Sequence, residues 1–183
     1  SFIMEHDHLS YTEALRYLAR KYHIDIKESE TTPEDIQRHN EIESLGIVNE
    51  YASRYFIEML HQSEKGKNIG LSYFKERGFR DDIIEKFQLG YSPEKSDEFS
   101  QTALKNGYKK EYLVKTGLTL ENERGLYDRF HGRVMFPVHN LSGKVIAFGG
   151  RTLRTDKNVA KYLNSPESEI YHKSKVLYGI YFA

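Results

Sequence analysis

The stretch RVMFPVHNLSGKVIAFGGR, residues 133–151, decides the fold that the sequence predicts. The apolar side chains of Val134, Phe136 and Val138 alternate along the chain, which is the period of a β-strand. Residues 140–143 supply a turn, and residues 145–148 form an apolar returning segment. The stretch therefore predicts an antiparallel β-hairpin.

Two features of this hairpin carry further predictions. Pro137 has no N–H to donate to a neighbouring strand, so we expect it at an edge or a bulge. Gly149, Gly150 and Arg151 directly follow the second predicted strand. They can form a place where the backbone approaches a phosphate, with the arginine as a bidentate donor. The alternative is a tight turn with a solvated arginine, which the dipeptide alone favours because it matches neither glycine-rich nucleotide fingerprint.

The residues before the hairpin are predicted to be helical. Thr32 and Pro33 form a typical helix start, and apolar residues then recur at helical spacing up to Leu60, which indicates one long helix over residues 32–62. The sequence predicts an α+β fold, with a helical N-terminal part followed by a mixed α/β subdomain with a β-hairpin sheet. Short helices are expected between residues 69 and 117, each ending at a glycine: Gly78, Gly90, Gly107 and Gly117.

The first residues of the chain are predicted to form a detachable appendage. Ser10 and Glu13 make a capping box before an amphipathic pattern that predicts a short helix up to Tyr22. Residues 27–32, KESETT, contain nothing apolar and are typical of a linker. His6 and His8 could ligate a metal, but a site needs further converging ligands and the sequence identifies none, so a metal site is not favoured.

Length and composition narrow the class of protein. A chain of 183 residues can bury one core of ordinary size with a small appendage. It has no cysteine, which excludes a disulfide scaffold, a thiolate nucleophile and cysteine-ligated zinc within these residues. No apolar run approaches the roughly 20 residues of a membrane span, and no signal peptide is recognisable, so we expect a soluble intracellular protein without a membrane partner. A start at Ser1 and an end in LYGIYFA lead us to expect a piece of a longer protein.

Positive charge is concentrated in the second half of a chain that has 27 basic and 27 acidic residues overall. Lys161 precedes Tyr162, and Asn164 follows as a neutral hydrogen-bonding group. Cations interleaved with aromatic rings are typical of surfaces that bind single-stranded nucleic acid, although a merely solvated basic face is the alternative. Between residues 128 and 175 the bases are Arg129, Arg133, Lys144, Arg151, Arg154, Lys157, Lys161, Lys173 and Lys175, and the acids are Asp128, Asp156, Glu167 and Glu169.

Catalytic groups are not recognisable beside these cations. Two-metal nucleotidyl transfer needs carboxylates clustered around ions about 4 Å apart. The adjacent pair Asp81 and Asp82 stands at a predicted helix start, where acids complement the helix dipole. No Ser-His-Asp or Cys-His arrangement can be assembled. We expect ordinary surface histidines at positions 131, 139 and 172.

At this point the residues resemble the bacterial replicative DNA primases of the DnaG type. DRFHGRVMFPVHNLSGKVIAFGGRTL (128–153) and KYLNSPESEIYHKSKVLYGI (161–180) are similar to the N-terminal subdomain of the RNA polymerase core of these enzymes. SFIMEHDHLSYTEALRYLARKYHIDI (1–26) is similar to the end of their zinc-binding domain, and YFKERGFRDDIIEKFQLGYSP (73–93) to the helical run between. The resemblance implies that residues 1–29 are the tail of the zinc-binding domain with its linker. Residues 30–183 would then be the N-terminal subdomain of the core, without the Toprim subdomain.

The resemblance also implies a function. The whole enzyme would be a DNA-directed RNA polymerase, a nucleotidyltransferase that makes short RNA primers from ribonucleoside triphosphates during replication in the cytoplasm. It would act as a monomer, with Mg²⁺ in the Toprim subdomain, Zn²⁺ in the zinc-binding domain and a replicative helicase bound through a further C-terminal domain. This chain would hold no metal and no catalytic residue and would be inactive alone.

The part that this chain would supply is a basic groove for single-stranded DNA template and RNA–DNA hybrid. The resemblance carries four cations over to that groove, and three further residues lie in the same motifs. At His139 and Asn140 the chain departs from the basic residue and following acid that many members have. The groove residues are Arg77, Arg151, Lys161 and Lys173, and the further ones are Arg133, Tyr162 and Asn164.

Two other functional classes are compatible with the residues. The chain could be a stand-alone, non-catalytic module that binds single-stranded nucleic acid. It could also be an interaction domain whose long helix over residues 32–62 recruits partners. Removing the residues before about Asn40 would abolish the main interaction only in the last case.

Overall fold

The computed structural model describes residues 17–22, 32–154 and 158–183. The chain divides into two compact units, Ser1–Arg38 and His39–Ala183. In the first unit residues 17–21 are helical, and the N–H of Tyr22 donates to the carbonyl of Leu18 at 2.9 Å. The predicted capping box at Ser10, the linker residues 27–31 and the histidine pair His6 and His8 lie outside the described residues. The division at residues 29 and 30 stays a prediction.

The long helix α3 spans Pro33–Gln62, as the sequence predicts. Its first turn is capped reciprocally, because the N–H of Asp35 donates to Thr32 Oγ1 at 3.2 Å and the Asp35 carboxylate accepts the N–H of Thr32 at 3.1 Å. In the second unit α3 buries one face against the sheet. The rings of Phe56 on α3 and Phe148 on β5 meet edge to face with 5.5 Å between centroids.

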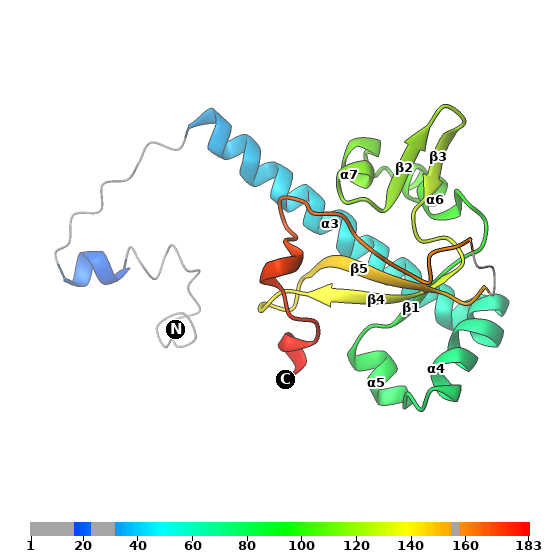
Figure 1. Ribbon diagram of the computed structural model, residues 1–183. Coiled ribbons are helices and arrows are strands. Elements are labelled where there is room, and N and C mark those ends of the chain that lie inside the picture. Colours follow the sequence, from blue (N-terminus) through cyan, green and yellow to red (C-terminus); the bar gives the residue numbers. More distant parts are fainter. Residues whose placement is uncertain (1–16, 23–31, 155–157) are drawn as a thin grey trace. The chain divides into compact units, whose positions relative to one another are not determined.

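The predicted hairpin is confirmed and forms the centre of a larger sheet. Strands β4 (Arg133–His139) and β5 (Val145–Thr152) are joined by a turn in which Gly143 has φ +80° and the N–H of Asn140 donates to the carbonyl of Lys144. Short strands β1 (Gly90–Ser92) and β6 (Tyr162–Asn164) extend it. Within the described residues the result is a four-stranded antiparallel sheet in the order β1-β4-β5-β6. Figure 1 shows β4 and β5 side by side.

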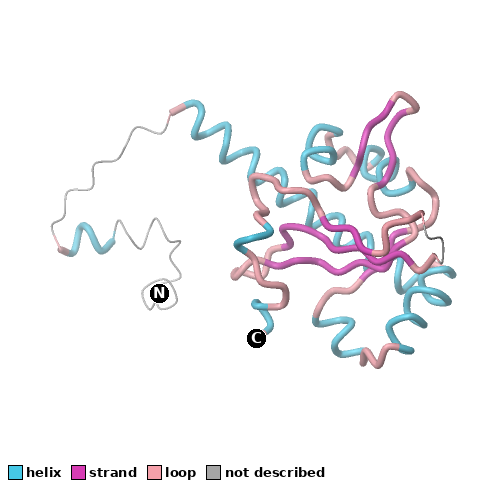
Figure 2. The backbone as a smooth tube through the Cα atoms, in the orientation of Figure 1, coloured by secondary structure: helices cyan, strands magenta, loops and turns pink. Residues whose placement is uncertain are grey.

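A second hairpin, which the sequence reading missed, consists of β2 (Thr119–Asn122) and β3 (Gly125–Asp128). Figure 2 shows these two strands set apart from the main sheet. The mixture of helices with antiparallel sheets confirms the predicted α+β class.

Pro137 occupies an edge position, as predicted. It pairs with Phe148 on β5, whereas the pairing of β4 with β1 ends at Met135. The position therefore needs no donor toward β1. The register of the hairpin shifts between Val138 and His139, immediately after the proline.

Short helices lie between α3 and β1 and between β1 and the second hairpin, and 3₁₀ turns follow β6. Gly78, Gly107 and Gly117 follow helices with φ of +80°, +86° and +69°, which confirms three of the four predicted helix ends. The short helices are the π-helix η1 (Gly66–Leu71), α4 (Ser72–Glu76), α5 (Asp81–Lys86), α6 (Glu98–Lys105), α7 (Lys110–Lys115) and the 3₁₀ turns η2 (Lys173–Lys175) and η3 (Ile180–Phe182).

Gly90 does not end a helix, so that prediction is wrong. It lies in β1, where an added Cβ would stand 2.6 Å from the Cβ of Phe56 on α3. The backbone reverses two residues earlier at Gln88, which has φ +54°. The glycine is required by the close approach of strand and helix rather than by a cap.

The sheet is packed on both faces, which decides where side chains on β5 can go. Met135 and Phe148 belong to a core cluster with α3, α6 and α7. Val134 belongs to a second cluster with Phe74 and Ile84 of α4 and α5. Because side chains alternate along a strand and Arg151 pairs with Val134, Arg151 lies on the face that carries α4.

A buried carboxylate ties the second hairpin to α6. Asp128 is 2% exposed, and its carboxylate accepts the N–H of Phe99 at 2.8 Å and that of Ser100 at 2.9 Å. These are orphan donors in the first turn of α6. Burial raises the pKa of Asp128, and the hydrogen bonds from Ser100 and Phe99 oppose that rise.

Among the described residues no helix is long and apolar enough to cross a membrane.

Candidate nucleic-acid interface

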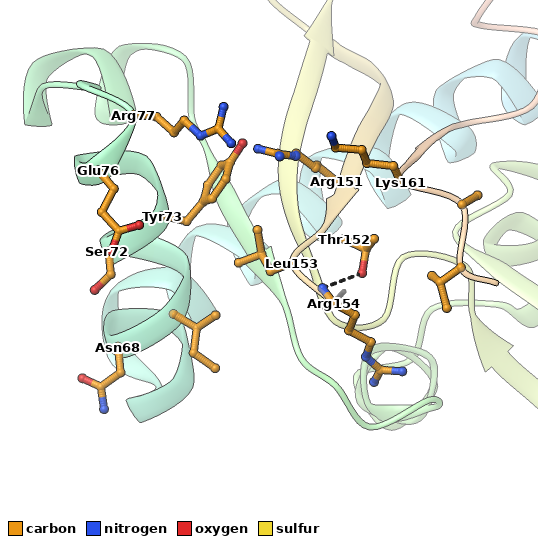
Figure 3. Close-up of a pocket in the computed structure, with 13 residues that line it drawn as sticks. Asn68, Ser72, Tyr73, Glu76, Arg77, Arg151, Thr152, Leu153, Arg154 and Lys161 are labelled. Carbon is orange, nitrogen blue, oxygen red and sulfur yellow. Dashed lines mark hydrogen bonds between the residues drawn. The ribbon is translucent and has the colours of Figure 1, made fainter. Parts of the chain in front are cut away.

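A cavity of about 840 Å³ lies between α4 and the end of β5 (Figure 3). Ser72, Tyr73, Glu76 and Arg77 line it from the side of α4. The opposite wall comes from the end of β5 and the residues before β6. We call this cavity the cationic groove and define it by Tyr73, Arg77, Arg151, Arg154 and Lys161, all of which line it.

The α4 wall is placed by the π-helix η1, which follows α3 after residues 63–65 and continues directly into α4. A Cβ added at Gly66 would stand 1.9 Å from the carbonyl oxygen of Met59, so only glycine fits there. Ser63 Oγ donates to that same carbonyl at 2.6 Å and accepts the N–H of Gly66 at 2.9 Å. Single π turns of this kind are frequent at functional sites.

Arg151 reaches the groove from inside the sheet. It is 9% exposed, and its guanidinium carbon lies 4.7 Å from the ring centroid of Tyr73 and 5.6 Å from that of Tyr162. The second contact follows from register, because Arg151 and Tyr162 are directly paired on β5 and β6. Its Nε is buried and finds no hydrogen-bond partner within the described part of the chain. An unpaired buried donor is costly, so this group favours a bound acceptor.

Three cations of the groove have no acid partner among the described residues, whereas Arg154 interacts electrostatically with Glu94. Within the residues that the structure describes, Arg77, Arg151 and Lys161 make no ion pair, although Glu76 lines the same cavity. Close by, in contrast, Arg80 pairs with Asp82 at 2.8 Å, and Lys75 pairs with Asp81. Guanidinium and ammonium groups that converge without acid partners form a site for an anion, such as a phosphate group.

Arg133, which was predicted beside these cations, has a different environment. It is buried, and its guanidinium donates to the carbonyl of Ala160 at 2.9 Å and to those of Gly150 and Lys161 at 3.4 Å each. Burial lowers the pKa of Arg133, with the charges of Arg154 and Arg129 adding to the effect. The side chain braces the segment that leads into β6 and does not line the groove.

Lys173, Tyr162 and Asn164 line a second cavity of about 440 Å³ beside the first. Its walls are largely apolar. Tyr162 is 62% exposed and connects the two sites, because its ring contacts Arg151, which lines the cationic groove. The N–H of Lys173 donates to the Glu167 carboxylate at 2.9 Å, which holds the backbone of η2. The structure therefore brings Arg77, Arg151 and Lys161 together and places Lys173 in the neighbouring cavity.

Gly149 and Gly150 lie inside β5, so the interpretation as a tight turn is wrong. A Cβ on Gly150 would stand 2.6 Å from the ring of Phe130, which makes this glycine a packing requirement. At Gly149 the nearest atom to an added Cβ is Asn164 Oδ1 at 3.4 Å. Gly149 lines the second cavity, on the same face of β5 as Arg151.

The histidines of the basic segment, residues 128–175, differ in their environments. His139 is buried, so the expectation of a surface histidine is wrong there. Its Nε2 lies 2.9 Å from Gln88 Oε1, and burial lowers its pKa. His131 is partly buried, with Nδ1 2.8 Å from the carbonyl of Asp128. His172 is exposed, and its Nδ1 lies 3.1 Å from Glu167 Oε2.

Sequence reasoning missed Tyr73, Arg154 and Glu76 as groove residues. The aromatic and cation of the YFKER stretch were a usable signal, because Tyr73 and Arg77 are four residues apart and share a helix face. No group of three or more histidine, aspartate or glutamate side chains in the described residues could hold a metal ion. The described residues therefore do not fit a catalytic metal.

Comparison with known proteins agrees with this geometry. The family model described as "DNA primase catalytic core, N-terminal domain" matches residues 55–183. A DNA primase of Halalkalibacterium halodurans is 38% identical over 185 residues, covering 100% of this chain and 30% of that protein. The chain thus spans about a third of the length of the curated relatives it matches.

Solved structures give the same result. A DnaG primase catalytic domain bound to single-stranded DNA is 33% identical with a TM-score of 0.71, over 78% of this chain and 45% of that one. The zinc-binding and RNA polymerase domains of Aquifex aeolicus primase are 28% identical with a TM-score of 0.67, over 98% of this chain and 41% of that one. On the family match and these likenesses together, the chain belongs to the family of the N-terminal domain of the DNA primase catalytic core.

Proposed function

We propose that this chain is the part of a bacterial DNA primase that grips single-stranded template DNA, with the cationic groove as its phosphate-binding surface. The convergence of Arg77, Arg151 and Lys161 without acid partners among the described residues carries this proposal. The likeness to a primase catalytic domain bound to single-stranded DNA supports it. The neighbouring cavity with Tyr162 and Lys173 would continue the same path, with Tyr162 as a stacking platform.

The whole enzyme would use this grip to make RNA primers. It would be a nucleotidyltransferase that joins ribonucleoside triphosphates on the template in the bacterial cytoplasm, acting as a monomer recruited by a replicative helicase. Because the described residues offer no cluster of metal ligands, we assign Mg²⁺ and Zn²⁺ to other parts of a primase and give this chain no step that needs them.

Binding to labelled oligothymidylate, followed by fluorescence anisotropy at several salt concentrations, tests the groove. Each phosphate contact on a single strand contributes about 0.7 to the slope of log affinity against log salt. Lys161→Ala should weaken binding roughly three- to tenfold, flatten the slope by about 0.7 and leave stability within about 0.5 kcal/mol.

Lys110→Ala is the matched control, because it removes one exposed cation that pairs with Glu121, and neither residue lines the groove. It should leave binding unchanged. If Lys161→Ala and Lys110→Ala weaken binding equally, the groove has no special role and the basic segment is only a solvated face.

Primer synthesis separates the enzyme from the stand-alone binding module. A whole primase that carries Lys161→Ala should lose template-dependent primer synthesis while melting normally. The 183-residue chain alone should make no primers with template, ribonucleotides and magnesium. Synthesis by the chain alone would contradict the proposed division of labour, and unchanged synthesis by the variant enzyme would favour the binding module.

A further inference from the structure

The ring of Tyr73 contacts two arginines of the cationic groove at once. The guanidinium carbons of Arg77 and Arg151 lie 5.4 Å and 4.7 Å from its centroid. Figure 3 shows both side chains reaching toward the Tyr73 ring, with Lys161 pointing in from the opposite wall. Such distances are those of cation–π contacts.

Tyr73 is itself held firmly. It stands on α4 directly after the π-helix, and its ring meets that of Phe74 edge to face with 5.6 Å between centroids. Phe74 is fully buried in the core cluster that packs against the sheet. The Tyr73 ring is thus anchored on one side and presents a face to the groove on the other.

A ring holds a guanidinium in a way that suits phosphate binding. An acid in the place of Tyr73 would neutralise Arg151 and compete with a phosphate for its N–H groups. A ring attracts the cation through its face, leaves the charge in place and leaves the N–H edge of the planar guanidinium free to donate. The missing hydrogen-bond partner of Arg151 Nε, within the described residues, agrees with this arrangement.

We propose that Tyr73 is a positioning residue of the cationic groove, whose ring orients the Arg151 guanidinium, and beside it that of Arg77, toward template phosphate. The inference rests on the proposed function, because it assigns Tyr73 a role through the arginines that would bind the strand. Its hydroxyl is not required, so phenylalanine should replace it and an aliphatic side chain should not.

The free protein provides the first test. In a ¹⁵N-labelled sample the Nε–H proton of Arg151, identified by its loss in Arg151→Lys, should be shifted by the ring current of Tyr73. The shift should persist in Tyr73→Phe and move toward the unstructured position in Tyr73→Leu. An Arg151 signal at the unstructured position in the wild-type chain would overturn the proposal, even if Tyr73→Leu failed to fold.

Binding provides the second test, with a labelled oligothymidylate of about 16 nucleotides. Tyr73→Phe should bind within about twofold of wild type, and Tyr73→Leu should bind roughly three- to tenfold more weakly. In an Arg151→Ala background the effect of Tyr73→Leu should shrink to about twofold, because the two residues act as a unit. Circular dichroism should show unchanged folding of the variants.

The outcomes separate the two proposals. If Arg151→Ala and Lys161→Ala weaken binding but Tyr73→Leu does not, the groove stands and the positioning role of Tyr73 is wrong. Equal losses from Tyr73→Leu with and without Arg151 also contradict it, since the ring would then act on the strand directly. If none of the three variants weakens binding, the proposed function itself fails.

Discussion

The buried carboxylate of Asp128 should be worth more to the stability of the fold than its place in a short strand suggests. Asp128→Ala removes the acceptor of the N–H groups of Phe99 and Ser100 and leaves them buried at the start of α6. Loss of a helix cap costs about 1 kcal/mol, and each buried group left without a partner costs about 1–3 kcal/mol. Relief of the buried charge offsets part of this. We therefore expect a loss of about 2–4 kcal/mol in the free energy of unfolding.

Urea denaturation followed by circular dichroism measures this loss. In thermal unfolding the midpoint temperature of the variant should be lower by roughly 5–15 °C. Asp97→Ala is the matched control. Asp97 precedes α6 in the chain at the usual capping position, yet it makes no side-chain cap and pairs with Lys95 at 3.4 Å. Its removal should cost no more than about 0.5 kcal/mol. A larger cost for Asp97→Ala than for Asp128→Ala would show that the cap has been assigned to the wrong residue.

The contribution of Asp128 to the free energy of unfolding should change with pH in a definite direction. Because burial raises the pKa of Asp128, the native chain binds this proton more tightly than the unfolded chain does. The contribution of Asp128 to stability is therefore greatest below its ordinary pKa of 3.8 and decreases as the pH rises through the raised value. The stability advantage of wild type over Asp128→Ala should be smaller at neutral pH than in mild acid.

Two further predictions concern the sheet. Gly150→Ala should destabilise the fold by about 1–3 kcal/mol in urea denaturation, because its Cβ meets the Phe130 ring, whereas Gly149→Ala should cost less than about 1 kcal/mol; equal costs would contradict the packing argument. Burial lowers the pKa of His139 below 6.5, so the unfolded chain binds this proton more readily than the native chain does. The free energy of unfolding should therefore fall as the pH drops below about 6.5, and His139→Phe should reduce that fall. Parallel profiles of stability against pH for the two proteins would refute this role of His139.

The long helix and the central hairpin could be predicted because their signals are local. The cap of α3 lies within four residues of sequence, from Thr32 to Asp35. The turn between β4 and β5 is made by Asn140, whose side chain accepts the N–H groups of Ser142 and Lys144. Such contacts are visible in a sequence because every partner is close in the chain.

The short strands could not be predicted with the same rules. β1 and β6 have three residues each, which is too short to show a period, and β4, the partner of β1, lies far away in the chain. Gly90 has the same local appearance as the helix-ending glycines, and only the approach of Phe56 reveals its role. The second hairpin did carry a local signal, because Asn122 Oδ1 accepts the N–H of Arg124 in the turn before Gly125.

The candidate groove shows the same division between local and distant information. Resemblance brought Arg77, Arg151 and Lys161 into one list, and the structure places them around one cavity. The spacing of Tyr73 and Arg77 is visible in the sequence, but the contact of Tyr73 with Arg151 depends on the packing of α4 against the sheet. A cation–π contact between distant segments leaves no periodic pattern in the sequence.

Arg133 and Arg151 show how strand register decides between structure and function. Both are arginines in the central hairpin, and local sequence does not distinguish them. Arg151 is paired with Val134, the neighbour of Arg133, so the two arginines project from opposite faces of the sheet. One face turns Arg133 onto the backbone carbonyls of residues 150, 160 and 161, where it braces the fold. The other face presents Arg151 to Tyr73 in the groove. A shift of one residue in the register of β4 against β5 would put both arginines on the same face, and the separation of brace from binding group would be lost.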